Sequence, residues 1–98
     1  MNTIFHYESE RELESGFLWY EGQTAGLGYA FLDDVYSAIR RIKQYPRVGN
    51  DFGEGVRRVL IRRFPYCLWY AVEEEVVVIY AVAHLHREPQ YWISRLNK

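Results

Sequence analysis

Three apolar runs between Gly55 and Trp92 constrain the fold of this chain more than any other feature of its sequence. They are rich in valine, isoleucine, tyrosine and tryptophan, and two short breaks separate them, at Phe64-Pro65 and at the three glutamates of residues 73–75. Runs of β-branched and aromatic residues bounded by such breaks are typical of strands joined by tight turns. The sequence therefore predicts three consecutive strands, over residues 56–64, 66–73 and 76–84.

A helical hairpin is predicted before these strands. Apolar side chains recur every three or four residues at Leu27, Phe31, Val35, Ala38 and Ile42. This spacing predicts an amphipathic helix over residues 27–44, which Pro46 ends because it disfavours helical geometry at the residue before it. The pattern of Ser9 and Glu12 is that of a capping box, which predicts a first helix over residues 10–21.

A short β-prone run over residues 3–7 adds a first strand before the hairpin. The predicted last strand is apolar on both faces, whereas a helical hairpin covers only one face of a sheet. The other face must be covered either by residues 89–96 or by a second polypeptide. We expect residues 47–54 to form a loop without regular structure.

The composition indicates one domain in a reducing compartment. A chain of 98 residues with 49% hydrophobic side chains should form one domain, over residues 1–98. Its single cysteine, Cys67, excludes an internal disulfide. The sequence shows no secretory signal and no apolar run near the roughly 20 residues that span a bilayer. We therefore expect a cytoplasmic protein that does not enter the membrane.

Charge is unevenly distributed along the chain. Residues 1–34 carry seven acids and one base, a net charge of −6, whereas residues 35–70 carry eight bases and two acids, a net charge of +6. Most of these bases are arginines, which suit the forked recognition of phosphate and carboxylate groups. The alternatives left open are a basic surface that binds a partner and a set of solvated faces without a ligand.

Four sequence segments, in the same order as the predicted elements, resemble the RelE/ParE family of bacterial toxins. They are WYE at residues 19–21, GLGYAFLDDV at 26–35, RRFPYCLWY at 62–70 and AVAHLHREPQYW at 81–92. The resemblance implies an α+β fold: an N-terminal strand, an antiparallel two-helix hairpin packed on a mainly antiparallel sheet, and a short C-terminal segment. It also implies the toxin of a type II toxin–antitoxin module, often associated with plasmid stabilisation, and a cognate antitoxin whose tail wraps the toxin.

The resemblance leaves the target open. RelE-like members cut mRNA on the ribosome, whereas ParE-like members bind and poison DNA gyrase without a known hydrolytic site. The AVAHxxRxPxYW motif and the short final segment are closer to the ParE-like members, so inhibition of gyrase is the first hypothesis. The alternatives are a ribosome-dependent mRNA endonuclease and a degenerate member that binds only its antitoxin and operator DNA.

Two groups of residues are candidates for the site. Cleavage of RNA needs a base, an acid and cations that stabilise charge on phosphorus, and the candidates for these roles are His84, His86, Arg87 and Tyr91. The candidates for binding a nucleic acid or the target are Arg57, Arg58, Arg62, Arg63, Arg87 and Trp92. No lysine lies between Arg47 and Arg95, which departs from the lysine-using RelE pattern. We expect no metal and no cofactor.

Each candidate also has a purely structural interpretation. His84 could be a hydrogen-bonded strand end, and Tyr91-Trp92 could pack the C-terminal segment on the sheet. The four arginines fall two and two on the faces of one predicted strand, so some of them should form salt bridges, with the glutamates of residues 73–75 as candidate partners. Trp19-Tyr20 is expected in the core, and Cys67 is expected to be buried and inert.

Overall fold

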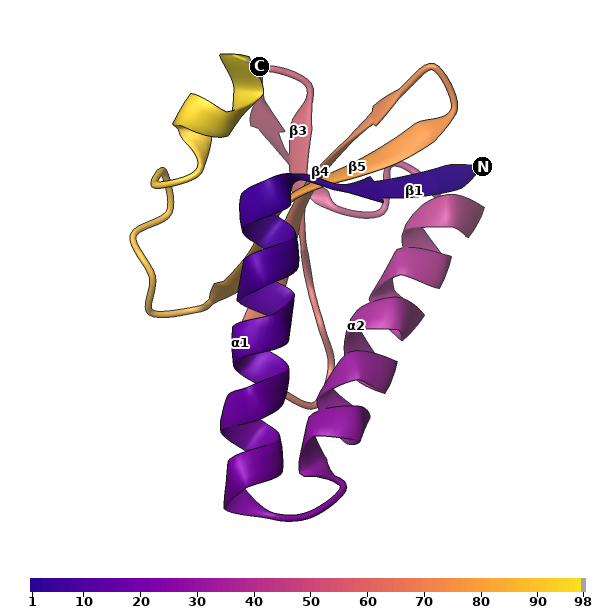
Figure 1. The fold of residues 1–98 in the computed structure, drawn as a ribbon. Helices are drawn as coiled ribbons and strands as arrows, with labels where there is room; N and C mark the ends of the chain where they lie inside the picture. Colours follow the sequence, from indigo (N-terminus) through magenta and orange to yellow (C-terminus); the bar gives the residue numbers. More distant parts are fainter. Residues whose placement is uncertain (98) are drawn as a thin grey trace.

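Two helices pack on a five-stranded sheet in the computed structural model, which describes residues 1–97 (Figure 1). The elements in chain order are β1 (Asn2–Phe5), α1 (Tyr7–Gln23), α2 (Leu27–Gln44), β2 (Asn50–Gly53), β3 (Val56–Leu60), β4 (Tyr66–Glu73), β5 (Val76–His84) and a terminal 3₁₀ helix (Ile93–Asn97). Neither helix of these described residues is long and apolar enough to cross a membrane.

The sheet has the strand order β1-β5-β4-β3-β2. β1 runs parallel to β5, and the other neighbouring strands are antiparallel. The predicted α+β class, with a hairpin on a mainly antiparallel sheet, is confirmed. The prediction of an irregular loop over residues 47–54 is wrong at its end, because β2 forms there as an exposed edge strand.

The sheet is covered on both faces. One core lies between the helices and the sheet, and its fully buried side chains include Phe31, Val35 and Ile79. A smaller core on the opposite face joins Trp69 to Trp92 of the C-terminal segment, with ring centroids 4.7 Å apart. The C-terminal segment therefore covers part of the second face of β5, at Ala81 and Ala83, while Val76 and Val78 on the same face remain half-buried.

The first helix begins differently from its prediction. α1 starts at Tyr7, and its cap is His6, whose Nδ1 accepts the backbone N–H of Glu8 at 3.0 Å. Ser9 lies inside the helix, and its hydroxyl donates to the carbonyl of Ile79 at 2.8 Å. The predicted capping box of Ser9 and Glu12 is therefore wrong: both side chains contact β5 instead.

The helical hairpin is closed by a close contact between its two helices. A Cβ added at Gly28 would lie 2.6 Å from the carbonyl oxygen of Phe17, so only glycine allows this approach. The carboxylate of Glu21 accepts the backbone N–H groups of Gly26 and Gly28 at 2.8 and 2.9 Å. This carboxylate satisfies free amides at the start of α2, which stabilises the antiparallel arrangement.

Candidate functional site

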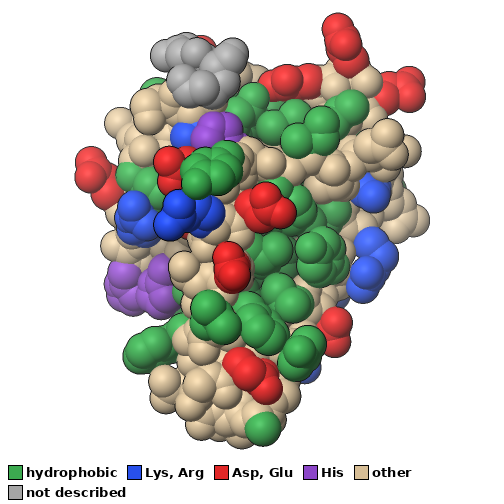
Figure 2. Space-filling view, viewed as in Figure 1, with side chains coloured by type: hydrophobic (Ala, Val, Ile, Leu, Met, Phe, Trp, Pro, Cys, Tyr) green, Lys and Arg blue, Asp and Glu red, His purple; other side chains and the backbone are tan. Residues whose placement is uncertain are grey.

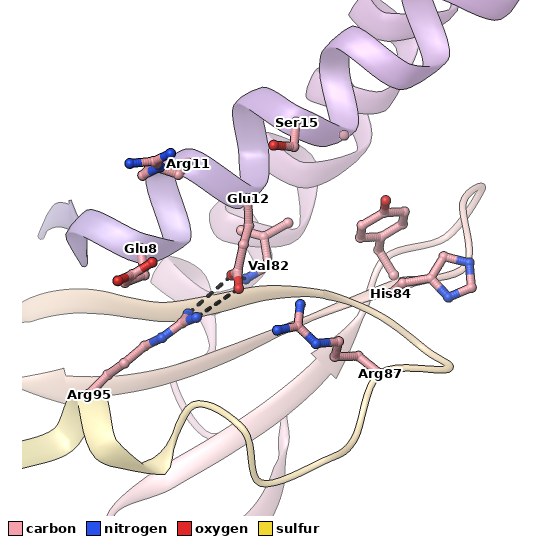
Figure 3. Close-up of a pocket in the computed structure, with 10 residues that line it drawn as sticks. Glu8, Arg11, Glu12, Ser15, Val82, His84, Arg87 and Arg95 are labelled. Atoms are coloured by element: carbon pink, nitrogen blue, oxygen red, sulfur yellow. Dashed lines mark hydrogen bonds and ion pairs between the residues drawn. The ribbon is translucent and has the colours of Figure 1, made fainter.

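A polar cleft lies between α1, the end of β5 and the segment that follows it (Figure 3). Its lining residues are Glu8, Arg11, Glu12, Ser15, Gly16, Tyr66, Val82, His84, Arg87 and Arg95. Two of the four predicted catalytic residues, His84 and Arg87, thus line one cleft. Tyr91 lies next to it and lines an adjoining depression with Arg87 and Arg95.

Arg87 supplies the cleft with an unneutralised positive charge. Its guanidinium carbon lies 3.8 Å from the centroid of the Tyr91 ring, a cation–π contact. Within residues 1–97, the only ion pair between side chains joins Arg95 to Glu12, so no carboxylate lies within ion-pair distance of Arg87, although Glu8 and Glu12 line the same cleft. The exposed guanidinium can therefore bind an anionic group such as a phosphate or a carboxylate.

His84 stands at the end of β5 with one ring nitrogen already committed. Its Nδ1 accepts the backbone N–H of His86 at 3.1 Å, so the neutral ring carries its proton on Nε2. The two imidazoles are stacked with centroids 5.1 Å apart, and Tyr66 packs on His84 edge-on at 5.3 Å. His84 therefore combines the structural role that the sequence allowed with an Nε2 that forms no hydrogen bond to residues 1–97, whereas His86 does not line the cleft.

Tyr91 is held by a carboxylate. Its hydroxyl donates to Oε2 of Glu12 at 2.8 Å, and burial together with the Glu12 charge raises the pKa of Tyr91 above its usual value. The tyrosine is therefore a poor proton donor, since its proton stabilises the contact with Glu12. The geometry favours a role in holding Arg87 over a role in proton transfer.

Trp92 is buried rather than presented to a partner. Only 1% of its surface is exposed, and it packs against Trp69 and Phe52. Its prediction as a contact for a nucleic acid or protein target is therefore wrong, whereas the alternative that it packs the C-terminal segment on the sheet is confirmed. The expectation of a core position fails for Trp19, which is 63% exposed.

The four predicted binding arginines belong to two elements. Arg57 and Arg58 lie in β3: Arg57 donates to the carbonyl of Gly49 at 2.8 Å, and Arg58 lies 5.7 Å from the ring of Trp69. Arg62 and Arg63 lie in the loop after β3, not in the strand. None of the four lines the polar cleft.

The predicted salt bridges of these arginines to residues 73–75 are absent from the part of the chain that the structure describes. The register explains why, because Arg57 and Arg58 pair with Tyr70 and Trp69, at a distance from the β4–β5 turn. Arg62 and Arg63 are therefore exposed with their charge available at the surface, whereas Arg57 and Arg58 are half-buried.

A buried carboxylate fixes the loop that carries Arg62 and Arg63. Asp34 of α2 is 5% exposed, and its two oxygens accept the backbone N–H groups of Arg62 and Arg63 at 3.0 and 2.6 Å. The guanidinium of Arg63 also donates to the carbonyl of Ala30 at 3.3 Å. These contacts place exposed arginines beside Arg40 of α2 in one shallow depression.

An apolar groove runs along the outer surface between the helices. Figure 2 shows hydrophobic side chains gathered there, with acidic side chains beside them. The groove is lined by Tyr7, Glu10, Arg11, Leu13, Glu14, Phe17, Leu32 and Tyr36. Tyr7 and Tyr36 are 65% and 42% exposed, so this surface is both apolar and accessible.

Two residues that sequence reasoning missed are central to the cleft. Glu12 accepts hydrogen bonds from the backbone N–H of Val82 at 2.9 Å, from Tyr91 and from Arg95. Tyr66 lines the cleft beside His84, and burial raises its pKa. The sequence gives no signal for Glu12, because its partners are 70 to 83 residues away.

Buried Cys67 plays no part in the cleft. Burial raises the pKa of its thiol to about 11, so the thiolate is scarce at neutral pH. The expectation that Cys67 is buried is confirmed, and its raised pKa agrees with the expected low reactivity. Within the described residues, no group of three or more histidine, cysteine or acidic side chains is placed to hold a metal ion.

Comparisons with known proteins identify the fold. No protein-family model and no curated protein sequence matches the chain. A chain from the chromosomal ParDE TA system of P. aeruginosa superposes with a TM-score of 0.72 and 15% identity, covering 86% of this chain and 95% of that one. The isolated RelE toxin of E. coli superposes with a TM-score of 0.65 and 18% identity, covering 98% of this chain and 96% of that one. The chain therefore has the RelE/ParE toxin fold.

Proposed function

We propose that this chain is the toxin of a toxin–antitoxin pair and that it inhibits growth by binding and poisoning DNA gyrase in the cytoplasm. The observation that carries the proposal is the shared fold, which extends over nearly the whole chain in both structural comparisons. The four toxin-like segments of the sequence support the same assignment. Fold alone does not define a target, so the choice of gyrase rests on the chemistry of the cleft.

The cleft favours binding over hydrolysis. Efficient cleavage of RNA by its 2′-hydroxyl needs one group to take a proton and another to give one. The Tyr91 hydroxyl is committed to Glu12, and no lysine lines the cleft. Arg87 remains as an exposed cation, which suits the recognition of a charged surface. We therefore assign Arg87 to target binding, with Arg62 and Arg63 as a second contact.

A second candidate function is that of a ribosome-dependent mRNA endonuclease, and the position of His84 favours it. His84 lines the same cleft as Arg87, and its Nε2 is not engaged by a hydrogen bond from the described residues. An imidazole can both take up and release a proton, and the arginine would stabilise charge on phosphorus. In this reading His84 is the proton-transfer group and Arg87 the electrostatic stabiliser.

Induced expression in bacteria with two readouts separates the candidates. We expect growth arrest and a loss of negative supercoiling in a reporter plasmid, while mRNA on ribosomes stays intact. Arg87→Ala should relieve the arrest, and Arg47→Ala, an exposed arginine outside the cleft, serves as the matched control. Cuts in mRNA phased with codons, with unchanged supercoiling, would overturn the gyrase assignment in favour of the endonuclease. If neither readout changes, both activities are refuted and a module that only binds its antitoxin and operator DNA gains support.

The apolar groove between α1 and α2 is the surface that we assign to the antitoxin. Its apolar side chains suit the apolar face of an amphipathic segment, and its two acids, Glu10 and Glu14, outnumber its one base, Arg11, which favours basic flanking residues. A tail that wraps the toxin would bury this exposed surface. The partner is accordingly an antitoxin segment with an apolar stripe and basic edges.

Neutralisation tests this surface. Tyr36→Glu places a charge in the groove, so we expect the variant to inhibit growth even when the antitoxin encoded beside it is co-expressed. Tyr45→Glu is the control, because Tyr45 is 62% exposed and lies outside the groove. Full neutralisation of the Tyr36 variant would show that the antitoxin docks elsewhere.

A further inference from the structure

The edge of β5 loses its neighbouring strand halfway along its length. β1 pairs with β5 only as far as Phe5 opposite Ile79, after which the chain enters α1. At the same point β5 contains a bulge: Trp69 pairs with Ala81 and Tyr70 with Ile79, so Tyr80 has no partner in β4. Beyond Ile79 the outer edge of β5 therefore presents backbone groups that no strand satisfies.

Two side chains take the place of the missing strand. The carboxylate of Glu12 accepts the backbone N–H of Val82 at 2.9 Å, and the guanidinium of Arg95 donates to the carbonyl of Tyr80 at 2.7 Å. The same two side chains form an ion pair at 2.8 Å, and their exposed fractions are 17% for Glu12 and 11% for Arg95. Together they connect α1, the open edge of β5 and the C-terminal segment.

The position of Arg87 depends on this connection. The hydroxyl of Tyr91 donates to Glu12 at 2.8 Å, and the guanidinium carbons of Arg87 and Arg95 lie 3.8 and 5.0 Å from the centroid of its ring. Arg87 is exposed, with Tyr91 as its principal support. Figure 3 shows Arg87 and Arg95 reaching toward Glu12 from the segment below the helix.

We propose that Glu12 is a positioning residue for the toxin site: its carboxylate holds Tyr91 and Arg95 against the open edge of β5, and Tyr91 in turn fixes Arg87 in the cleft. Glu12 acts through other side chains and does not contact the target. The expected loss of toxicity rests on the proposed function. The structural half of the inference, that Glu12 fixes the position of Arg87, does not depend on the identity of the target.

The test of the structural half is an NMR comparison of Arg87 in the wild-type chain, Glu12→Gln and Glu88→Gln. A guanidinium over an aromatic ring has its proton resonances shifted upfield by the ring current. We expect this shift in the wild-type chain, its loss in Glu12→Gln, and its retention in the control, which removes a nearby exposed carboxylate. The amide resonances of β4 should stay in place, since the sheet core is intact.

Tyr91→Phe tests the same contact if Glu12→Gln does not fold. Tyr91→Phe retains the ring and removes only the hydroxyl that Glu12 accepts, so the ring-current shift should decrease. Unchanged Arg87 resonances in whichever of these variants folds would overturn the proposal.

Growth inhibition then tests the functional half. Glu12→Gln should lose toxicity to the same extent as Arg87→Ala, while Glu88→Gln should remain toxic. Full toxicity in a Glu12→Gln chain whose Arg87 has lost its ring-current shift would overturn the proposal, because the position of Arg87 would then not matter. A wild-type chain that does not inhibit growth would refute the proposed function, and the NMR comparison would still decide the role of Glu12.

Discussion

Removing the carboxylate of Asp34 should destabilise the chain and release its arginine loop. Asp34 of α2 is nearly completely buried, and its carboxylate accepts hydrogen bonds from the backbone N–H groups of both Arg62 and Arg63. In Asp34→Ala both amides lose a charged acceptor. Hydrogen bonds to charged groups contribute about 1.5–3 kcal/mol each, and unpaired buried donors add a desolvation cost.

The expected loss is smaller than the sum of two such contributions, because both hydrogen bonds are only partly buried and water can replace part of what the carboxylate supplied. We expect the free energy of unfolding to fall by about 2–4 kcal/mol, a large fraction of the 5–15 kcal/mol typical of small domains. For a domain of this size each kcal/mol corresponds to roughly 4–8 °C in the melting temperature.

Urea unfolding followed by tryptophan fluorescence measures this change. Asp33→Ala is the matched control: Asp33 is the preceding helix residue, is exposed, and should change stability by less than about 0.5 kcal/mol. An Asp34 variant as stable as the control would refute the argument that this carboxylate holds the loop.

Three further predictions concern glycine, cysteine and tryptophan positions. Gly28→Ala should destabilise the chain by about 1–3 kcal/mol, because the new Cβ would meet the backbone of α1. Gly22→Ala should stabilise the chain by about 0.4–1 kcal/mol, because the space around Gly22 is open, and urea unfolding of both variants checks the two values. The thiol of Cys67 should react with Ellman's reagent at pH 8 only after denaturant is added. Folding raises the pKa of this thiol from 9.0 to about 11, so the contribution of the thiol to stability is complete below pH 9 and is lost as the pH rises through about 11. Urea unfolding at pH 8 and above pH 9 checks this dependence. Trp92→Ala should cost about 3–5 kcal/mol in the same unfolding measurement, and a loss below about 1 kcal/mol would contradict its role in the second core.

Local patterns predicted the regular elements well. The spacing of apolar residues placed α2 at Leu27–Gln44, and the proline and glutamate breaks placed β4 and β5 at their observed bounds. These signals are reliable because each element buries one continuous set of side chains. The sequence does not predict β2, because the four residues of Asn50–Gly53 are all exposed in an edge strand and so show no apolar pattern.

The cleft could be predicted only in part. His84 and Arg87 are close in sequence, and both lie at the end of one predicted strand, so the sequence could predict that they lie close together. The role of Glu12 depends on a bulge in β5 and on the C-terminal segment, which no local pattern encodes. The local capping-box pattern of Ser9 and Glu12 was even misleading, since tertiary contacts with β5 replaced the local ones.

Aromatic residues divided between core and surface in a way that the sequence did not specify. Trp92 is buried because the C-terminal segment folds back on the sheet, and Trp19 is exposed because it lies on the outer side of α1. A helix of this kind presents three or four side chains per two turns to the core, so neighbouring aromatic residues need not share one environment.

The central claim is that the chain is a toxin that binds gyrase through Arg87. Its most direct test is the supercoiling of relaxed plasmid by purified gyrase in the presence of the purified wild-type chain, Arg87→Ala or Arg47→Ala. We predict that the wild-type chain and the Arg47 variant inhibit supercoiling and that the Arg87 variant does not. Undiminished supercoiling with the wild-type chain, together with cleavage of mRNA on ribosomes, would contradict the claim.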